Sequence, residues 1–339
     1  MSAPTVVLIP GDGIGPEITE AVTRIIAAAG VEINWVERHA GVVALSDGDE
    51  VLPQSTVDAV KEHKVALKGP CTTPVGKGFQ SVNVQLRKAF DLYAAARPVR
   101  NLPGIDSRYE NVDIVIIREN TEGLYSGVES EITPGVVTST KVATVKGCSR
   151  IAEWAFNYAE SRGRKKVTAF HKANIMKLTD GLFLKCAEAA HANHPSVEHD
   201  SAIIDAACMR LVQDPTQFDM VMMENLYGDV VSDLCAGLVG GLGVVPGANF
   251  GEHGAIFEAV HGSAPDIAGQ NKANPLALLM SAEMMLEYLN DLNSDSSYQD
   301  AANRIRNAYE AALTAGEKTG DIGGSLGTRE FADAVIARL

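Results

Sequence analysis

Hydrophobic residues along this chain follow two alternating patterns. Short runs of β-branched and other apolar residues predict buried strands at 5–10, 64–68, 112–117, 166–170 and 218–223. Segments with an apolar residue at every third or fourth position predict helices at 17–29, 149–161, 181–192, 275–292, 298–315 and 328–339. Strands that alternate with helices are typical of the α/β class, with much parallel pairing between strands.

Residues 120–146 interrupt this alternation. The segment is rich in Thr, Val, Ser, Glu and Gly and has no helical period, so it predicts a β-ribbon rather than another strand–helix unit. The sequence shows no internal repeat and no low-complexity tract. A length of 339 residues favours two domains or one large α/β body.

The composition is that of a globular protein with a sizeable core. Hydrophobic residues make up 46% of the chain and charged residues 21%, which excludes disorder for most of the sequence. The net charge is −14, and a field of this sign repels nucleic acid and anionic membranes. We therefore expect neither as a partner, and a polyanionic small-molecule substrate would need a local group of cationic side chains.

The five cysteines indicate a reducing compartment. Their number is odd and none of them form a C-x-x-C pair, so neither a disulfide framework nor a zinc ribbon is indicated. The first ten residues lead directly into a predicted strand, without the features of a secretory or organellar leader. We expect a cytoplasmic location, although a mature organellar protein without its leader would look the same.

A glycine-rich segment at residues 11–17 joins the first predicted strand to the first helix. Its position is that of a dinucleotide-binding loop, but Pro16 and Glu17 follow Gly15 where the Rossmann fingerprint requires another glycine. Two interpretations stay open. The segment is either a tight strand-to-helix turn or a backbone surface that lines a ligand cleft.

Three arginines and two neutral donors suit a ligand with several carboxylates. Guanidinium groups bind carboxylates through two parallel hydrogen bonds, and Ser81 and Asn83 add a hydroxyl and an amide near Arg87. A separate surface ion pair would explain any single arginine equally well. The candidate ligands of the substrate are Ser81, Asn83, Arg87, Arg97 and Arg118.

Further polar residues follow predicted strands, where ligands of α/β proteins usually lie. Tyr125 follows the strand at 112–117 and is either a packing aromatic or a proton donor. Lys172 follows the strand at 166–170 and could act as a base if its amine were partly desolvated. A surface lysine is the alternative.

Two aspartates predict a metal site. Asp229 and Asp233 are four residues apart at the start of a predicted helix, so they share one face and repel each other. A hard divalent cation such as Mg²⁺ or Mn²⁺ makes this pair favourable, and Asp205 offers a third carboxylate at another strand end. Helix capping explains one of these aspartates, but not all three.

In order, these motifs resemble the β-decarboxylating dehydrogenases, which include isocitrate, 3-isopropylmalate, homoisocitrate and tartrate dehydrogenases. The similarity is closest to the NAD-dependent isocitrate dehydrogenases. It runs from Gly11-Asp12-Gly13-Ile14-Gly15 through Asn225-Leu-Tyr-Gly228-Asp229 to Asp321-Ile-Gly323-Gly324. The resemblance implies an α/β fold of two domains with a β clasp, and no Rossmann domain.

The family also implies how the chain is divided. The large domain, on the cofactor side, would span 1–92 and 240–339. The small domain, with substrate, metal and dimer interface, would span 93–122 and 145–239, and the clasp 123–144. The resemblance further implies a homodimer whose active sites take Lys172 and Asp205 from the partner subunit.

The implied reaction is the oxidative decarboxylation of isocitrate to 2-oxoglutarate and CO₂ with reduction of NAD. Tyr125 and Lys172 would be the catalytic acid and base, and Asp205, Asp229 and Asp233 would hold Mg²⁺ or Mn²⁺. NADP-dependent relatives tend to carry Lys and Tyr at positions 266 and 267, whereas an aspartate there repels a 2′-phosphate, which favours NAD. The implied cofactor-binding residues are Thr72, His261, Gly262, Ala264, Asp266, Ile267 and Asn274.

Two alternatives to this function stay open. Isopropylmalate or homoisocitrate could be the substrate, but isopropylmalate needs an apolar wall where Ser81 and Asn83 place hydrogen-bond donors. The chain could also be a regulatory subunit of a heteromeric isocitrate dehydrogenase. Such subunits tend to lose a metal carboxylate, the lysine or the tyrosine, and this chain keeps them.

Overall fold

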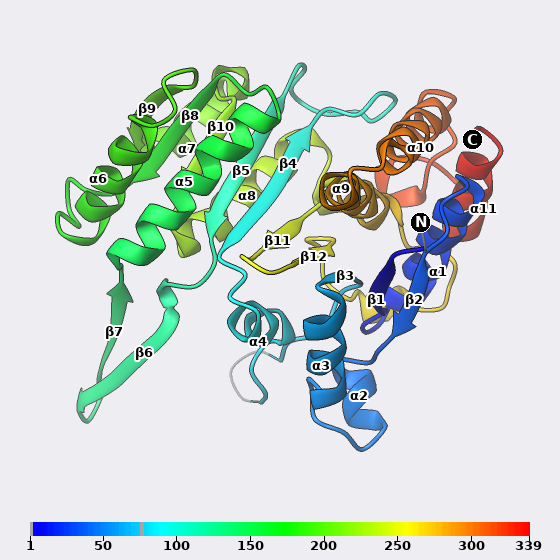
Figure 1. Cartoon of the computed structure of the whole chain (residues 1–339), viewed down its shortest axis with the longest axis horizontal. Helices are drawn as coiled ribbons and strands as arrows, with labels where there is room; N and C mark the ends of the chain where they lie inside the picture. The colour runs from blue at the N-terminus through cyan, green and yellow to red at the C-terminus, as the bar shows by residue number, and fades with distance from the viewer. Residues whose placement is uncertain (1–2, 75–77) are drawn as a thin grey trace. The chain divides into compact units, whose positions relative to one another are not determined.

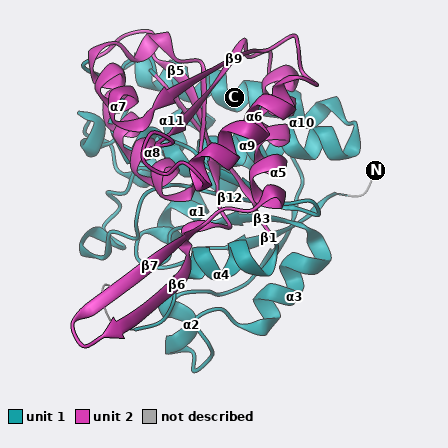
Figure 2. Ribbon diagram, turned by 90° about the vertical axis from the view of Figure 1, so that its left-hand side faces the viewer, with its two compact units in different colours: residues 1–90, 101–108, 239–339 teal, residues 91–100, 109–238 magenta. Residues whose placement is uncertain are grey.

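The computed structural model describes residues 3–74 and 78–339, which form a mixed α/β structure (Figure 1). The chain divides into two compact units (Figure 2). Unit 1 contains Met1–Phe90, Asn101–Arg108 and Val239–Leu339, and unit 2 contains Asp91–Arg100 and Tyr109–Leu238. Among the described residues, no helix is both long and apolar enough to cross a membrane.

Unit 1 is built around five strands in the order β2-β1-β3-β12-β11. All neighbours pair in parallel except β11 and β12, which are antiparallel. Val6, Val7 and Ile9 on β1 are fully buried, as expected for a parallel strand covered on both faces. The strands are β1 (Thr5–Ile9), β2 (Asn34–Glu37), β3 (Val65–Lys68), β11 (Ala248–Phe250) and β12 (Ala255–Glu258).

Helices cover the strands of unit 1. The most deeply buried is α9, which packs on β3, β11 and β12 and is apolar over most of its surface. The unit contains α1 (Gly15–Ala28), α2 (Val42–Ser46), α3 (Gln54–His63), α4 (Val82–Ala89), α9 (Leu276–Asn293), α10 (Ser296–Thr314) and α11 (Thr328–Ile336), with short 3₁₀ turns at Leu242–Val244, Pro265–Ile267 and Gly320–Ile322.

The larger group of paired strands in unit 2 has the order β4-β5-β10-β8-β9. β4 and β5 are antiparallel and the other pairs are parallel. The strands are β4 (Ala94–Arg100), β5 (Asp113–Glu119), β8 (Lys166–His171), β9 (Glu198–Ile203) and β10 (Met220–Met223). The helices are α5 (Val145–Ser161), α6 (Thr179–His191), α7 (Ile204–Gln213) and α8 (Asn225–Val239), with a 3₁₀ turn at Pro215–Gln217.

A separate antiparallel hairpin belongs to unit 2. It consists of β6 (Gly123–Thr133) and β7 (Val136–Val142) and projects from the rest of the unit in Figure 2. The ribbon predicted from residues 120–146 is therefore confirmed. The hairpin exposes Val128, Ile132, Val136 and Val137 to solvent, which makes it an apolar surface without a covering layer in the single chain.

Every strand and helix predicted from the hydrophobic pattern overlaps an element of the same type. Two positions differ. Arg97 lies in the middle of β4, a strand that the hydrophobic pattern did not predict, because the antiparallel pairing with β5 extends to Arg100. Residues 101–108, which the family resemblance placed in the small domain, belong to unit 1, where the Gly104 carbonyl accepts a hydrogen bond of 2.7 Å from Lys318 Nζ.

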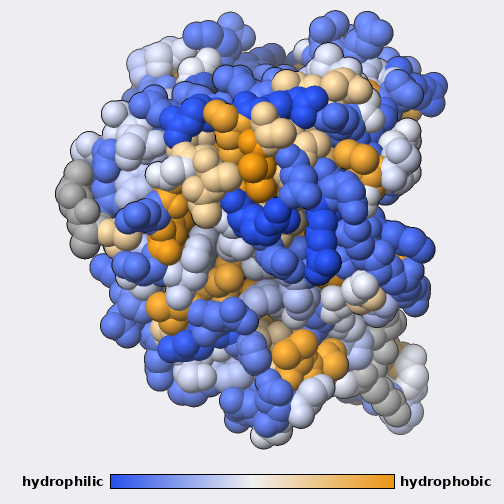
Figure 3. Space-filling model, turned by 90° about the vertical axis from the view of Figure 1, so that its right-hand side faces the viewer, coloured by the Kyte–Doolittle hydropathy of each residue, from blue (hydrophilic) through white to orange (hydrophobic). Residues whose placement is uncertain are grey.

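Polar side chains cover most of the face shown in Figure 3. Several apolar clusters interrupt this polar face, while most large apolar side chains of the strands and helices are buried.

Candidate active site

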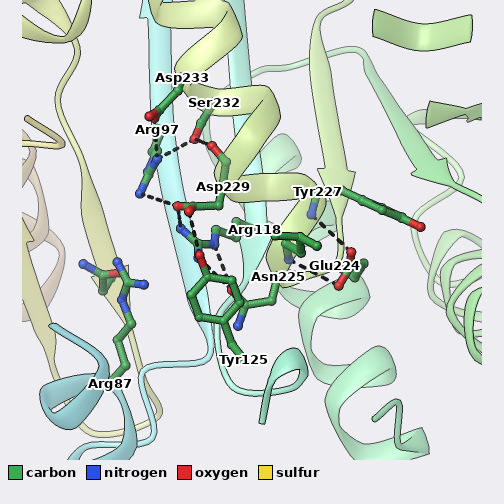
Figure 4. A network of polar contacts seen from close by, with 12 residues as sticks. Arg87, Arg97, Arg118, Tyr125, Glu224, Asn225, Tyr227, Asp229, Ser232 and Asp233 are labelled. Atoms are coloured by element: carbon green, nitrogen blue, oxygen red, sulfur yellow. Dashed lines mark hydrogen bonds and ion pairs between the residues drawn. The ribbon is translucent and has the colours of Figure 1, made fainter. Parts of the chain in front are cut away.

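A network of polar contacts in unit 2 surrounds Asp229 on α8 (Figure 4). Arg118 from β5 pairs with one carboxylate oxygen of Asp229, and the Tyr125 hydroxyl donates to the other at 2.6 Å. Arg97 Nη2 from β4 lies 3.8 Å from the same carboxylate. Residues from two strands, the hairpin and a helix thus meet at one side chain.

Strand register places the two arginines on one face. Arg97 lies opposite Ile116 in the β4–β5 pair, and Arg118 is two residues further along β5. Because side chains alternate along a strand, the two guanidinium groups point the same way. Asn225 Oδ1 accepts hydrogen bonds from Nε and Nη2 of Arg118, at 3.1 and 2.7 Å, and so orients its guanidinium group.

Asp233 lies one helical turn beyond Asp229. Its carboxylate is 3.5 Å from Arg97 Nη1. Burial and the neighbouring Asp229 raise the pKa of Asp233 against the opposing effect of Arg97. The side chains of Asp229 and Asp233 are 40% and 58% exposed, so both carboxylates are accessible to a ligand.

Tyr125 is held protonated. Burial and its hydrogen bond to the Asp229 carboxylate raise the pKa of the phenol, because both disfavour a second negative charge. The phenol is therefore an intact proton source at neutral pH.

Lys172 and Asp205 form a separate pair in unit 2. Lys172 follows β8, Asp205 lies in the first turn of α7, and Lys172 Nζ is 2.6 Å from Asp205 Oδ1. No group of three or more His, Cys, Asp or Glu side chains suited to a metal ion occurs within residues 3–74 and 78–339. The three predicted metal carboxylates are thus not gathered within one chain, and their assembly across two subunits stays a prediction.

The remaining candidate substrate residues lie in unit 1. Ser81 precedes α4, while Asn83 and Arg87 are on it. The Oδ1 atom of Asn83 and the Nε atom of Arg87 are buried and have no hydrogen-bond partner among the described residues. Buried polar atoms are nearly always paired, so these two atoms are available to a ligand.

A buried ion pair that the sequence did not predict supports Arg87. Parallel register aligns Glu258 on β12 with Lys68 on β3, and Lys68 Nζ lies 2.7 Å from the Glu258 carboxylate. Burial opposes the charge on Glu258, but Lys68 and Arg87 outweigh it and hold its pKa at about 2. Asn249 donates to the same carboxylate at 2.8 Å. In the sequence, the signal for this pair is that each of two apolar strands ends in a charged residue, Lys68 or Glu258.

The candidate cofactor residues also lie in unit 1. The hydroxyl groups of Thr72 and Ser263 are 2.7 Å apart, and His261 Nδ1 donates to the Gly262 carbonyl at 3.0 Å. His261 Nε2 is buried and has no partner among the described residues. Burial and the nearby Lys68 lower the pKa of His261, so the neutral ring presents Nε2 as a hydrogen-bond acceptor.

Two further cofactor candidates differ in their surroundings. Asn274 Nδ2 donates to Asp321 Oδ2 at 3.0 Å, which fixes its amide. Asp266 lies with Ile267 in the 3₁₀ turn at Pro265–Ile267, after Ala264 in the left-handed region at φ 37°. The Asp266 carboxylate is exposed and, within the described part of the chain, has no hydrogen bond or ion pair.

Lys141 on β7 also contributes to the site, and the sequence did not predict this. Its Nζ atom is 2.6 Å from Asp180 Oδ1 and 3.8 Å from Glu224 Oε1. Asp180 accepts the backbone N–H of Lys172 at 2.7 Å, and Glu224 accepts N–H groups at the start of α8. Lys141 therefore ties the hairpin to the Lys172 turn and to the helix with Asp229, and no local pattern in the sequence indicated this role.

Comparison with protein families shows the family of this chain. The family model described as isocitrate/isopropylmalate dehydrogenase matches residues 5–335. The chain belongs to this family. The resemblance inferred from the motifs is thus confirmed, and so is the α/β fold of the isocitrate/isopropylmalate dehydrogenases.

Individual relatives of the isocitrate/isopropylmalate dehydrogenase family match over almost the whole chain. A probable mitochondrial alpha subunit of NAD isocitrate dehydrogenase from Drosophila melanogaster is 50% identical, over 98% of this chain and 87% of the relative. A mitochondrial regulatory subunit of NAD isocitrate dehydrogenase from Dictyostelium discoideum is 48% identical, over 98% and 91%. The crystal structure of isocitrate dehydrogenase from Methylococcus capsulatus superposes with a TM-score of 0.94 at 44% identity, covering 99% of both chains.

The residues of this family member fit a divalent cation and a dinucleotide. Asp229 and Asp233 offer accessible oxygen ligands on one helix face, which suit Mg²⁺ or Mn²⁺. On the nucleotide side, the buried acceptor of His261 and the free carboxylate of Asp266 lack partners that a bound dinucleotide could supply.

Proposed function

We propose that this chain catalyses the oxidative decarboxylation of isocitrate to 2-oxoglutarate and CO₂, with NAD as hydride acceptor and Mg²⁺ or Mn²⁺ as metal. The observation that carries the proposal is the convergence of Tyr125, Arg97 and Arg118 on Asp229 and Asp233. It combines a proton donor, anion-binding cations and metal-binding carboxylates. The names of the relatives, which include subunits of NAD isocitrate dehydrogenase, support the choice of substrate and cofactor.

Substrate recognition rests on three arginines and two neutral donors. Arg87, Arg97 and Arg118 bind the substrate carboxylates, and Ser81 and Asn83 bind the carboxylate that distinguishes isocitrate from isopropylmalate. The branched alkyl group of isopropylmalate offers no acceptor to these donors, and it would leave the buried Nε of Arg87 unpaired. Unpaired buried polar groups discriminate strongly against a substrate that cannot satisfy them.

The chemistry divides between the bound groups and the chain. NAD, when bound, would supply the acceptor for the hydride from C2 of the substrate, and Asp205, Asp229 and Asp233 would hold a divalent ion whose charge would offset negative charge on the substrate oxygens. Lys172 Nζ accepts the proton of the substrate hydroxyl. After the 3-carboxylate leaves as CO₂, Tyr125 Oη donates a proton to C3, and its raised pKa keeps that proton in place until then.

The proposal includes a homodimer in which Lys172 and Asp205 serve the site of the partner. It is supported by the separation, within one chain, of the Lys172 and Asp205 pair from the pair formed by Asp229 and Asp233. We also propose a cytoplasmic location, tested by cell fractionation with an antibody to this chain.

Steady-state kinetics of the purified chain test the function. We expect the highest kcat/KM with isocitrate, NAD and Mn²⁺, loss of activity in EDTA, and recovery when Mn²⁺ is restored. 3-Isopropylmalate and homoisocitrate serve as competing substrates, and NADP as the competing cofactor. A higher kcat/KM with 3-isopropylmalate or homoisocitrate would show that isocitrate is not the preferred substrate.

A regulatory role within a heteromeric isocitrate dehydrogenase is the second candidate function. It is favoured by one observation, the 48% identity to a Dictyostelium discoideum relative that is named a regulatory subunit. Retention of Tyr125, Lys172, Asp205, Asp229 and Asp233 favours the catalytic function instead. Turnover by the purified chain alone supports catalysis. A chain that binds isocitrate, shows no turnover alone and activates a second, different chain would support the regulatory role.

A further inference from the structure

The glycine-rich segment at residues 11–17 has no role in the proposed chemistry, yet it contacts three loops of unit 1. The segment is a tight turn, in which the Gly15 N–H donates to the Asp12 carbonyl at 2.9 Å. Gly11 and Gly13 have positive φ values of 76° and 59°. A side chain at Gly11 would overlap the carbonyl oxygen of Pro70, and one at Gly13 that of Ser263. The turn therefore lies in close contact with the loops that contain Pro70 and Ser263.

Asp12 holds the first loop. Its carboxylate is buried, with only 3% of the residue exposed. Oδ2 accepts the backbone N–H of Thr72 at 2.8 Å, and Oδ1 accepts that of Val43 at 3.0 Å. The backbone N–H of Asp12 donates to the Pro70 carbonyl at 2.7 Å. Pro70 and Thr72 in the loop after β3, and Val43 in the first turn of α2, are thus attached to this one residue.

The second loop is attached through the backbone. The Ile14 N–H donates to the Ser263 carbonyl at 2.9 Å, and the Ser263 hydroxyl in turn meets the Thr72 hydroxyl at 2.7 Å. Ser263 lies between Gly262 and Ala264, in the loop that begins at His261. The position of Thr72 is therefore coupled to that of the candidate nucleotide-binding loop.

Glu17, in the first turn of α1, holds the third loop. Oε2 accepts the backbone N–H of Asn271 and Oε1 that of Ala273, both at 3.2 Å. The Thr328 hydroxyl at the start of α11 also contacts Oε1. Asn274, a candidate cofactor residue, follows Ala273 directly.

We propose that Asp12 and Glu17 are positioning residues for the dinucleotide. Their carboxylates hold backbone N–H groups of the loops that carry Thr72 and Asn274, and the turn between them holds the loop that carries His261, Gly262 and Ala264. Binding then requires little ordering of these loops, which improves affinity without direct contact with the ligand. This inference rests on the proposed use of NAD and assigns a purpose to a motif that is not a phosphate-binding fingerprint.

Charge-neutral variants of the same size test it. In Asp12→Asn the amide NH₂ must face the backbone N–H of either Thr72 or Val43, so one of these two hydrogen bonds is lost and the segment that made it moves. Glu17→Gln creates the same conflict with Asn271 or Ala273. Glu20→Gln is the matched control, because Glu20 is exposed on the same helix and its carboxylate has no partner in the described part of the chain.

The measurements are the Kd of NADH by fluorescence titration of the full-length protein, the separate KM values for NAD and isocitrate, and the melting temperature. We expect Asp12→Asn and Glu17→Gln each to raise the Kd of NADH at least about fivefold, while the KM of isocitrate changes less than about twofold. Glu20→Gln should leave the Kd within about twofold of the parent protein.

An unchanged Kd of NADH in both folded variants would overturn the inference, even if their melting temperatures fall, because the carboxylates would then be purely structural. Equal losses in the NAD and isocitrate parameters would overturn it too. If the parent protein binds no NADH, the proposed cofactor is wrong instead, so the two failures are distinguishable. Should Asp12→Asn not fold, Glu17→Gln and its effect on NADH affinity decide the outcome.

Discussion

At the scale of single residues, two buried side chains of opposite charge compensate each other. Lys68 and Glu258 have side chains that are 1% and 8% exposed, and each stabilises the charged form of the other. Burial disfavours the Lys68 ammonium, but Glu258 outweighs this effect and raises the pKa of Lys68. A pair of this kind is costly to break, because the remaining partner keeps its desolvation penalty.

Glu258→Gln should therefore destabilise the fold strongly. We expect a loss of about 3–5 kcal/mol in the free energy of unfolding, since Lys68 would stay buried without its counter-ion. Denaturant unfolding at neutral pH measures it, with Glu252→Gln as an exposed control from the turn before β12. The double variant Lys68→Met, Glu258→Gln should be more stable than Glu258→Gln alone. If the double variant is the less stable of the two, the buried pair is not the cause.

His194 makes stability depend on pH. Burial disfavours its charged form, but Glu160 and Glu153, at 2.9 and 3.1 Å, outweigh burial and raise the pKa above the usual 6.5. A raised folded-state pKa stabilises the protein below the unfolded-state pKa, and this contribution disappears as the pH rises through the folded-state pKa. His194→Gln should thus destabilise the protein more at about pH 5.5 than at about pH 8.5. Equal losses of stability at both pH values would show that the ion pairs contribute nothing.

At the scale of elements, helix α8 approaches the strands of unit 2 closely because it carries a glycine at the contact. A Cβ atom at Gly228 would lie 2.5 Å from Arg118 Cγ, whereas one at Gly237 on the same helix would meet no atom within 4 Å. This close approach lets Arg118 reach Asp229 and Asn225. Gly228 therefore permits a close contact and Gly237 does not, although both lower the intrinsic stability of the helix by a similar amount.

Replacing each glycine by alanine separates these effects. Gly237→Ala should stabilise the protein by about 0.5–1 kcal/mol, the usual gain from removing a glycine within a helix. Gly228→Ala should lose that gain and also lower kcat/KM for isocitrate about tenfold or more, because Arg118 must move away from Asp229. Thermal unfolding and steady-state kinetics of both variants are the measurements. Normal activity in Gly228→Ala would mean that the contact does not orient Arg118.

At the scale of the whole molecule, a complete site needs more than one chain under the proposed function. Lys172 pairs with Asp205 in one place, and Asp229 with Asp233 lies among the arginines in another. The apolar side chains of Met209 on α7 and Val230 on α8 are exposed, although apolar surface is normally buried. A second copy of the chain would both cover such surface and complete the metal ligands.

Mixing two inactive variants tests the shared site. Lys172→Met and Asp233→Asn each remove one half, and a mixed dimer keeps one intact site. Random exchange of subunits should restore about a quarter of the parental activity, because half of the dimers are mixed and one of their two sites works. Each variant mixed with itself is the control. Mixed dimers that form but stay inactive would contradict a site shared between subunits.

The sequence by itself determined the order and type of most elements and the chemistry of the strand ends. The spacing of hydrophobic residues indicates which face of an element is buried, and its change after residue 120 indicated the β6–β7 ribbon. Polar residues that follow an apolar strand indicate a ligand-binding edge of the sheet, so Lys172 and Asp229 were recognisable as candidates. β4 was not, because Ala94–Arg100 contains few β-branched residues and becomes a strand only by pairing with β5.

Only the tertiary structure decided which of these residues meet. The contacts of Asp12 with Thr72, Lys68 with Glu258 and Lys141 with Asp180 join residues that are far apart in the chain. Strand register and helix packing bring these residues together. The hydrophobic period of a segment contains no information on register or packing, because it describes each element in isolation. Local patterns therefore identified the reacting groups, while the residues that position them emerged from long-range packing.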